Sequence, residues 1–182
     1  MIITITGKPC SGKGTVAKLF ASKFNYEYIC TGDMFRQYAK QMGYDNILTF
    51  QTENELVTQV DNMVDNHIIE IGKTKLNSNI IIDSRLAWHF VPNSFKVFID
   101  VDDETAGERL LSANRETEKV ETLNEAILSL QKRWQTENDR YTELYQTNNL
   151  NLNNYDLVIN SSDLSPEEIV EKIKSAYDNF KN

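Results

Sequence analysis

The fold of this 182-residue chain is decided by one stretch near its start, Gly7-Lys8-Pro9-Cys10-Ser11-Gly12-Lys13-Gly14-Thr15. The stretch fits the pattern Gly-x4-Gly-Lys with a hydroxyl side chain two places later, a close variant of the phosphate-binding P-loop. The strand-like run Ile2–Thr6 leads directly into it, and a helical pattern follows it. Glycines let backbone N–H groups approach phosphate oxygens, and the start of a helix adds partial positive charge. The stretch therefore predicts a cradle for the phosphates of ATP, in which Lys13 reaches the β- and γ-phosphates and the Thr15 hydroxyl ligates Mg²⁺.

Apolar runs and helical patterns alternate along the rest of the chain. This alternation predicts an α/β fold of the P-loop NTPase type, with three α/β/α layers around a mostly parallel five-stranded sheet. We expect strands at Ile2–Thr6, Tyr26–Cys30, Ile80–Asp83, Phe95–Val101 and Tyr155–Ile159. We expect helices near Lys13–Phe24, Asp33–Met42, Glu53–Lys73, Glu104–Ala113, Glu121–Tyr145 and Pro166–Phe180.

Length and composition predict one domain that covers residues 1–182. The formal net charge of −8 disfavours a nucleic-acid polymer as partner. No apolar run approaches the ~20 residues of a transmembrane helix, and the N-terminus has no basic leader, so we expect no membrane association. Cys10 and Cys30 form no disulfide or metal-binding pattern, which favours a reducing compartment and a cytoplasmic location.

A second phosphate would need positive charge beyond the loop, and two clusters supply it where strands are predicted to end. Asp33 and Arg36 follow the second strand, and Asp83 and Arg85 end the third. Ligands of open α/β sheets bind at these strand ends, and a carboxylate such as Asp83 can hold Mg²⁺ through water or orient an acceptor. The alternatives are a solvated helix arginine and a surface ion pair, which contributes little stability.

A third cluster lies on the predicted helix Glu121–Tyr145. At ~100° per residue, Arg133, Glu137 and Arg140 fall within roughly 60° of one another, beside the apolar stripe rather than opposite it. Two arginines that border a core need an anionic partner, and Glu137 supplies only one charge. A bound phosphate is one solution, and an ion-pair set within the helix is the other.

Taken together, these motifs resemble those of the cytidylate kinases in their short form. The resemblance covers nearly the whole chain. It includes the opening through Val16-Ala17 and the segments Thr31-Gly32-Asp33-Met34-Phe35-Arg36, Asp83-Ser84-Arg85-Leu86-Ala87-Trp88, Arg133-x3-Glu137-x2-Arg140 and Asn154-Tyr155-Asp156-Leu157-Val158-Ile159-Asn160. It implies transfer of the γ-phosphate of ATP to a nucleoside monophosphate, with CMP or dCMP as the acceptor, by a monomeric enzyme that uses Mg²⁺.

The resemblance also implies roles for individual residues. Catalysis would fall to Lys13, Asp83, Arg85 and Arg133. ATP would be bound by Gly7, Lys8, Pro9, Cys10, Ser11, Gly12, Lys13, Gly14 and Thr15, with Arg109 and Arg115 on a lid at about 109–121. The monophosphate region would span about 33–73, with Asp33, Arg36, Arg85, Arg133, Glu137 and Arg140 as ligands, and Thr15 and Asp83 would hold the metal. The chain departs from the family pattern at Cys10 and Ser84, where Gly is usual, at Glu137, where Asp is usual, and in a lid with few arginines.

Two rival functions stay open on the sequence alone. One is an adenylate kinase or another small-molecule kinase on the same fold, since a P-loop does not determine the acceptor. The other is a non-catalytic ATP-binding module, for which the amphipathic stretch Glu53–Ile71 could be an interface. Tyr28 and the other aromatic side chains are assigned to core or rim packing, and His89 to a loop.

Overall fold

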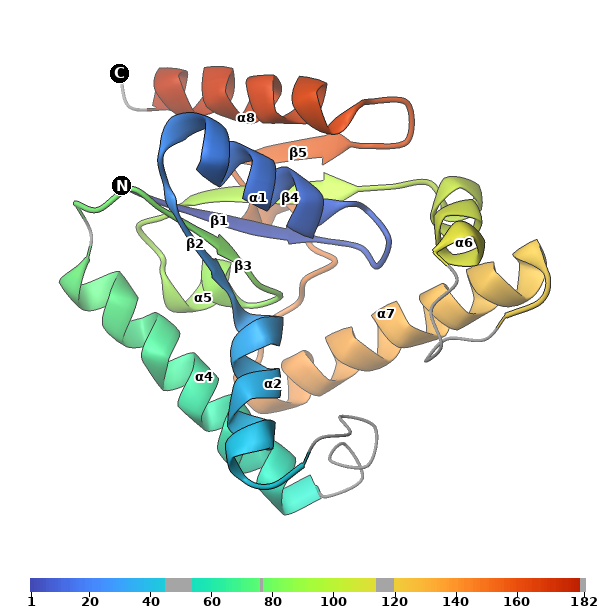
Figure 1. The fold of residues 1–182 in the computed structure, drawn as a ribbon, viewed down its shortest axis with the longest axis horizontal. Helices are drawn as coiled ribbons and strands as arrows, with labels where there is room; N and C mark the ends of the chain where they lie inside the picture. The colour runs from blue at the N-terminus through green and yellow to red at the C-terminus, as the bar shows by residue number, and fades with distance from the viewer. Residues whose placement is uncertain (45–53, 76, 114–119, 181–182) are drawn as a thin grey trace.

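The structure, a computed structural model, describes residues 1–44, 54–75, 77–113 and 120–180 (Figure 1). Strands and helices alternate along the chain, as predicted. The elements are β1 (Ile2–Gly7), α1 (Lys13–Phe24), β2 (Glu27–Cys30), α2 (Thr31–Gln41), α4 (Asn54–Thr74), β3 (Ile80–Asp83), α5 (Ala87–Phe90), β4 (Phe95–Asp100), α6 (Asp103–Ser112), α7 (Leu123–Tyr145), the 3-10 turn η1 (Leu152–Asn154), β5 (Leu157–Asn160) and α8 (Pro166–Phe180).

The five strands form one sheet in the order β2-β3-β1-β4-β5, and every neighbouring pair is parallel. The prediction of a mostly parallel sheet is therefore confirmed. The register places Cys30 opposite Asp83, and Ile5 of β1 opposite the same residue. Because parallel strands share a carboxyl end, the segments that follow β1, β2 and β3 meet at one edge of the sheet.

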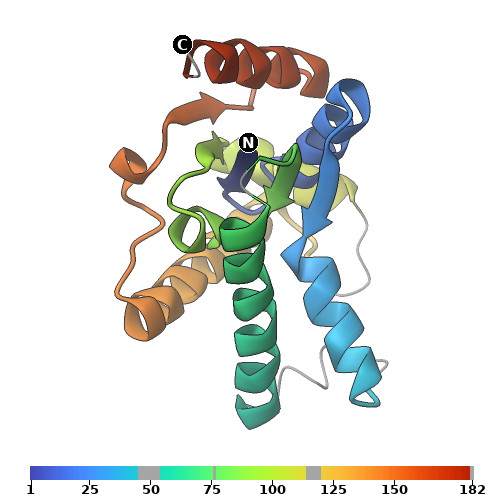
Figure 2. The same ribbon diagram turned by 90° about the vertical axis from the view of Figure 1, so that its left-hand side faces the viewer.

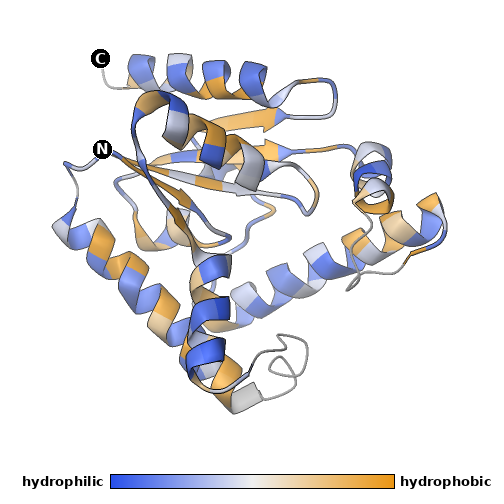
Figure 3. Cartoon of the chain, in the orientation of Figure 1, coloured by the Kyte–Doolittle hydropathy of each residue, from blue (hydrophilic) through white to orange (hydrophobic). Residues whose placement is uncertain are grey.

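Helices cover both faces of the sheet, which gives the predicted three layers (Figures 1 and 2). Ile3 and Ile5 of β1 point to the face covered by α1 and α8, where Phe20 and Tyr177 join the largest core cluster. Ile2 points to the opposite face, which α4 and α5 cover. Hydrophilic and hydrophobic colours alternate along α4, α7 and α8 in Figure 3. This pattern fits helices that bury one side only.

The α2 and α4 helices run side by side away from the sheet (Figures 1 and 2). Ala39 of α2 packs with Val60 and Val64 of α4, and the partly buried Leu56 and Val57 complete this cluster. The apolar side of α4 is thus covered from within the chain except at Met63, which is 40% exposed. This packing accounts for the periodicity without an external partner.

Local signals set several helix ends. Ser165 and Glu168 form the capping box expected before α8, with Glu168 N–H donating to Ser165 Oγ at 3.2 Å. Thr122 and Glu125 form a second box at the start of α7. The assignment of His89 to a loop is wrong, because it lies in the four-residue helix α5, which is too short for periodicity to predict. None of the helices in the described ranges is long and apolar enough to cross a membrane.

Candidate functional site

The loop between β1 and α1 has the conformation that a phosphate cradle needs. Its path is fixed by Lys8 N–H, which donates to Ile99 O at 3.2 Å, and by Ser11 N–H, which donates to Lys8 O at 3.2 Å. Gly12, at the N-cap of α1, has a φ of 80°. Cys10 has a φ of 60°, a left-handed conformation that L side chains disfavour. This explains why Gly is usual at that position in the family that the sequence resembles.

Two glycines of the loop are there because neighbouring atoms leave no room for a side chain. A Cβ on Gly7 would lie 2.3 Å from Ile99 O, so β1 and β4 could not approach as they do. A Cβ on Gly14 would lie 3.1 Å from Oδ2 of Asp83. The glycine between Lys13 and Thr15 thus lets the Asp83 carboxylate pack against the start of α1.

The Asp83 carboxylate at the end of β3 faces the loop lysine. Lys13 Nζ lies 2.6 Å from Asp83 Oδ1, and the Tyr28 hydroxyl donates to Asp83 Oδ2 at 3.3 Å. Asp83 is 4% exposed and Lys13 24%. Burial, together with the negative charge of Asp83, raises the pKa of Tyr28, so this hydroxyl keeps its proton and remains a donor.

Two of the predicted acceptor arginines lie across the loop from this pair. Arg85 donates through NH1 to Gly7 O, and its Nε lies 2.7 Å from Glu137 Oε2. Arg133 Nε donates to Glu137 Oε1 at 3.0 Å. Arg85 also lies over the Trp134 ring, 5.5 Å from its centroid. A single carboxylate therefore holds both guanidinium groups in the described structure.

These arginines and the loop line one cavity of about 270 Å³. The lining residues are Lys8, Pro9, Cys10, Ser11, Gly12, Lys13, Gly14, Thr15, Arg85 and Arg133. The cavity joins the donor-phosphate loop to positive charge from β3 and α7. That arrangement can hold two anionic groups close together.

The other predicted acceptor residues lie further out. Arg36 forms an ion pair with Asp33 on α2, and this pair lowers the pKa of the Asp33 carboxyl, chiefly through the hydrogen bond. Arg140 pairs with Asp61 of α4 rather than with Glu137. The α7 cluster is thus divided between the cavity and the contact with α4.

The side chains of two predicted ATP ligands hold the loop in place. The Arg109 guanidinium donates to Ser161 O at 2.8 Å and to Cys10 O at 3.3 Å. Lys8 Nζ lies 2.7 Å from Asp100 Oδ1. Arg115 and the rest of the segment 114–119, the middle of the predicted lid, fall outside the described residues.

The side-chain oxygens of Thr15 and Asp83 fit the Mg²⁺ that accompanies ATP. Thr15 is exposed in the first turn of α1, and the Asp83 carboxylate reaches the same loop. In the described ranges, no group of three or more His, Cys, Asp or Glu side chains could hold a metal ion. Mg²⁺ with nucleotides is bound through one or two protein oxygens, phosphates and waters, so Thr15 and Asp83 would suffice.

Sequence reasoning missed three residues of this region. Tyr28 was assigned to packing, although its position near the end of β2, beside β3, was a usable signal. Ser161 donates through Oγ to Ser11 O at 3.0 Å, and Asp61 meets Arg140. These two contacts join segments far apart in the sequence, and no local pattern indicates them.

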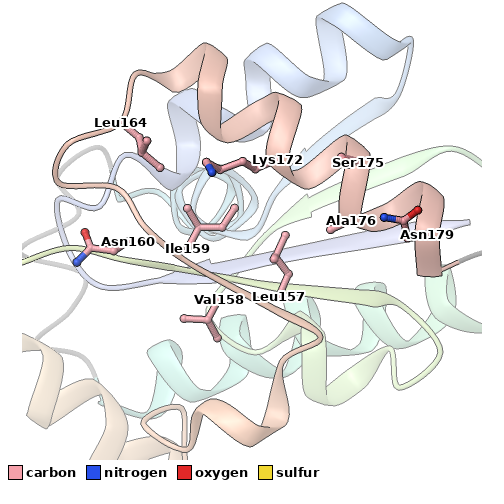
Figure 4. Close-up of a pocket in the computed structure, with 9 residues that line it drawn as sticks. All are labelled: Leu157, Val158, Ile159, Asn160, Leu164, Lys172, Ser175, Ala176 and Asn179. Carbon is pink, nitrogen blue, oxygen red and sulfur yellow. The ribbon is translucent and has the colours of Figure 1, made fainter.

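A second hollow, of about 550 Å³, lies between β5 and α8 (Figure 4). Its lining is Leu157, Val158, Ile159, Asn160, Leu164, Lys172, Ser175, Ala176 and Asn179. None of the predicted site residues lines it. Among the described residues that line this hollow, Lys172 is the only cation, and about half of the wall is apolar, which does not suit a triphosphate, so we place the site at the loop.

Comparison with known proteins gives the class and then the family. A family profile described as an AAA domain matches residues 3–144. With the loop and sheet above, this defines an ATP-dependent phosphotransferase of the P-loop kinase type. The cytidylate kinase of Methanocaldococcus jannaschii is 34% identical over 186 aligned residues, which cover 100% of this chain and 99% of that protein. The chain belongs to the cytidylate kinase family.

Two further matches limit what can be concluded from this family membership. An S-adenosylmethionine-dependent nucleotide dehydratase from Lacinutrix mariniflava is 35% identical over 177 residues, 96% of this chain but only 35% of that protein. The chain thus spans about a third of that relative. The solved shikimate kinase of Bacteroides thetaiotaomicron has a TM-score of 0.66 at 18% identity, over 98% of each chain, and supports the fold alone.

Proposed function

We propose that this chain transfers the γ-phosphate of ATP to a nucleoside monophosphate, with CMP or dCMP as the preferred acceptor. The observation that carries the proposal is the shared cavity, in which Arg85 and Arg133 face the loop that binds the donor phosphates. A phosphorylated acceptor needs such a second anion-binding group beside the donor phosphates. The preference for CMP is supported by the cytidylate kinase relative that matches from end to end.

The proposed reaction needs little proton chemistry, because the acceptor phosphate is already an anionic nucleophile. Backbone N–H groups of Gly12 to Thr15 and the Lys13 ammonium would hold the β- and γ-phosphates. Arg85 and Arg133 would hold the acceptor phosphate in line with the γ-phosphorus. One acceptor oxygen forms a bond to that phosphorus as the bond to the bridging oxygen of ADP breaks. Catalysis is then mainly positioning and charge neutralisation.

Other predicted residues have supporting roles in this proposal. Mg²⁺, when bound with ATP, neutralises charge on the β- and γ-phosphates, and Thr15 and Asp83 are the residues that would hold it. Glu137 occupies the two arginines before the acceptor arrives. Arg36, with Asp33, and Arg140 would border the acceptor on α2 and α7.

A coupled assay of ADP formation with a panel of acceptors tests the proposal. CMP and dCMP should give the highest kcat/KM, UMP and AMP lower values, and shikimate none. Arg85→Lys should raise the KM for CMP by about tenfold or more, because a lysine cannot make the bidentate contact of an arginine. A preference for AMP or shikimate would transfer the chain to another kinase class. ATP binding without turnover on any acceptor would favour the non-catalytic module.

A further inference from the structure

Tyr28 has a contact that neither packing nor the P-loop motif requires. Its hydroxyl donates to Oδ2 of Asp83 at 3.3 Å, while Lys13 takes Oδ1 at 2.6 Å. Within the described ranges, no other side chain hydrogen-bonds Oδ2. We propose that Tyr28 is a positioning residue: its hydroxyl fixes the rotation of the Asp83 carboxylate, so that the opposite oxygen faces Lys13 and the Mg²⁺ that arrives with ATP. The inference rests on the proposed function, because that function assigns Lys13 to the phosphates of ATP.

The carboxylate has little else to hold its rotation. A carboxylate has two equivalent oxygens that can exchange places by rotation about one bond. The Thr31 hydroxyl, at 3.4 Å, contacts the backbone carbonyl of Asp83 and not its side chain. Gly14 packs closely beside Oδ2, where a Cβ would lie only 3.1 Å away, but it has no side chain that could hydrogen-bond this oxygen. The Tyr28 hydroxyl is therefore the group that distinguishes the two oxygens.

Tyr28 also has a polar neighbour on the acceptor side. The Cys30 thiol lies close to both Tyr28 and Asp33, the partner of Arg36. Cys30 lies at the end of β2, directly opposite Asp83 in the register of β3. A continuous polar row thus runs from the donor lysine to α2, with Tyr28 in its middle. A tyrosine that only filled space would not need partners on both sides.

The positioning matters because Lys13 and Asp83 must exchange partners when ATP arrives. In this structure they neutralise each other across 2.6 Å. Phosphates then compete for the lysine, and Mg²⁺ competes for the carboxylate. Without the Tyr28 hydroxyl, Oδ2 is free to turn toward the ammonium, which strengthens the pair and opposes the exchange. The affinity for ATP with its metal should therefore fall, while the affinity for metal-free ATP should change little.

The test compares Tyr28→Phe with the matched control Tyr177→Phe. Tyr177 lies on the buried side of α8, is 1% exposed and belongs to the largest core cluster, so its substitution also removes one tyrosine hydroxyl. Calorimetry would give the dissociation constant of ATP with Mg²⁺ and with EDTA. For Tyr28→Phe we expect the constant with Mg²⁺ to rise about tenfold and the constant with EDTA to stay within twofold. For Tyr177→Phe both should match the unmodified protein.

A double-mutant cycle sharpens the result. Asp83→Asn removes the carboxylate, so Tyr28→Phe should have no further effect on ATP binding in that background. Equal changes with and without metal, no change at all, or a full effect of Tyr28→Phe beside Asp83→Asn would each overturn the inference. The binding assay uses no acceptor. A protein that phosphorylates no monophosphate but keeps the metal-linked difference would therefore contradict the proposed function and leave the role of Tyr28 standing.

Discussion

Replacing Lys13 with methionine separates the two things that this side chain does. The lysine pairs with Asp83 at 2.6 Å, where the carboxylate is 4% exposed and the lysine 24%. Methionine has nearly the same length and volume but no charge. Lys13→Met therefore leaves a buried carboxylate whose remaining side-chain partner is the Tyr28 hydroxyl at 3.3 Å. We expect a loss of stability and a separate loss of turnover.

The size of each loss follows from the geometry. Breaking a fully buried ion pair by removing one partner costs about 3–5 kcal/mol. Here Tyr28 remains and the lysine side is partly open to water, so we expect about 2–3 kcal/mol, or roughly 4–12 °C in Tm for a chain of this length. During turnover, the variant lacks one positive charge beside the transferring phosphoryl group. That loss should lower kcat by about 10²–10³-fold or more.

Urea unfolding and a coupled kinase assay measure the two losses on the same samples. The control is Lys13→Met combined with Asp83→Asn, which removes both charges. It should recover most of the stability, because no unpaired buried charge remains, and none of the activity. Wild-type stability in the single variant would show that the pair does not form. Recovered turnover in the double variant would refute a role for Lys13 in the chemistry.

Three other predictions can be checked with standard measurements. Arg36→Ala should change the free energy of unfolding by under ~1 kcal/mol, because the ion pair of Arg36 with Asp33 is exposed. The same variant should raise the KM for the acceptor and leave the KM for ATP unchanged. An unchanged KM for the acceptor would place Arg36 outside the site. The free energy of unfolding of Cys10→Val should be about 1–2 kcal/mol lower than that of Cys10→Gly, because a φ of 60° suits glycine and strains a β-branched side chain. Equal Tm values for the two variants would contradict this. The free energy of unfolding should fall as pH rises above about 10. Burial raises the pKa of several tyrosines in the folded state, so above this pH they ionise in the unfolded state but stay protonated in the folded state. A free energy of unfolding in urea that does not change from pH 9 to 11 would be inconsistent with this. The residues concerned are Tyr28, Tyr141, Tyr145, Tyr155 and Tyr177.

The strands, the long helices and the loop were predictable because their signals are local. The loop motif specifies a turn, and the apolar runs at Ile2–Thr6 and Ile80–Asp83 have the length and composition of buried strands. The N-terminal cap of α8 is likewise predicted by Ser165 and Glu168. Short α5 was missed because four residues hold barely one turn, too few for a period to appear.

The division of the α7 cluster shows where sequence reasoning ends. A helical projection places Arg133 and Arg140 within a small angle, but it hides the distance along the axis. Seven residues at 1.5 Å each separate the two by roughly 10 Å. Arg133 therefore meets Glu137 beside the loop, whereas Arg140 reaches Asp61 of α4. The position of α4 depends on tertiary packing, which the pattern of one helix cannot predict.

The same contacts explain how an acidic chain keeps a site rich in cations. In the described structure, several cations of the proposed site pair with carboxylates of the same chain. The pairs are Lys13–Asp83, Arg85–Glu137, Arg133–Glu137, Arg36–Asp33 and Arg140–Asp61. These carboxylates hold the cations in place without leaving unpaired buried charge, which would destabilise the fold. When the substrates bind, their phosphates replace these carboxylates as partners of the cations. The side chains are therefore already ordered by folding, before catalysis begins.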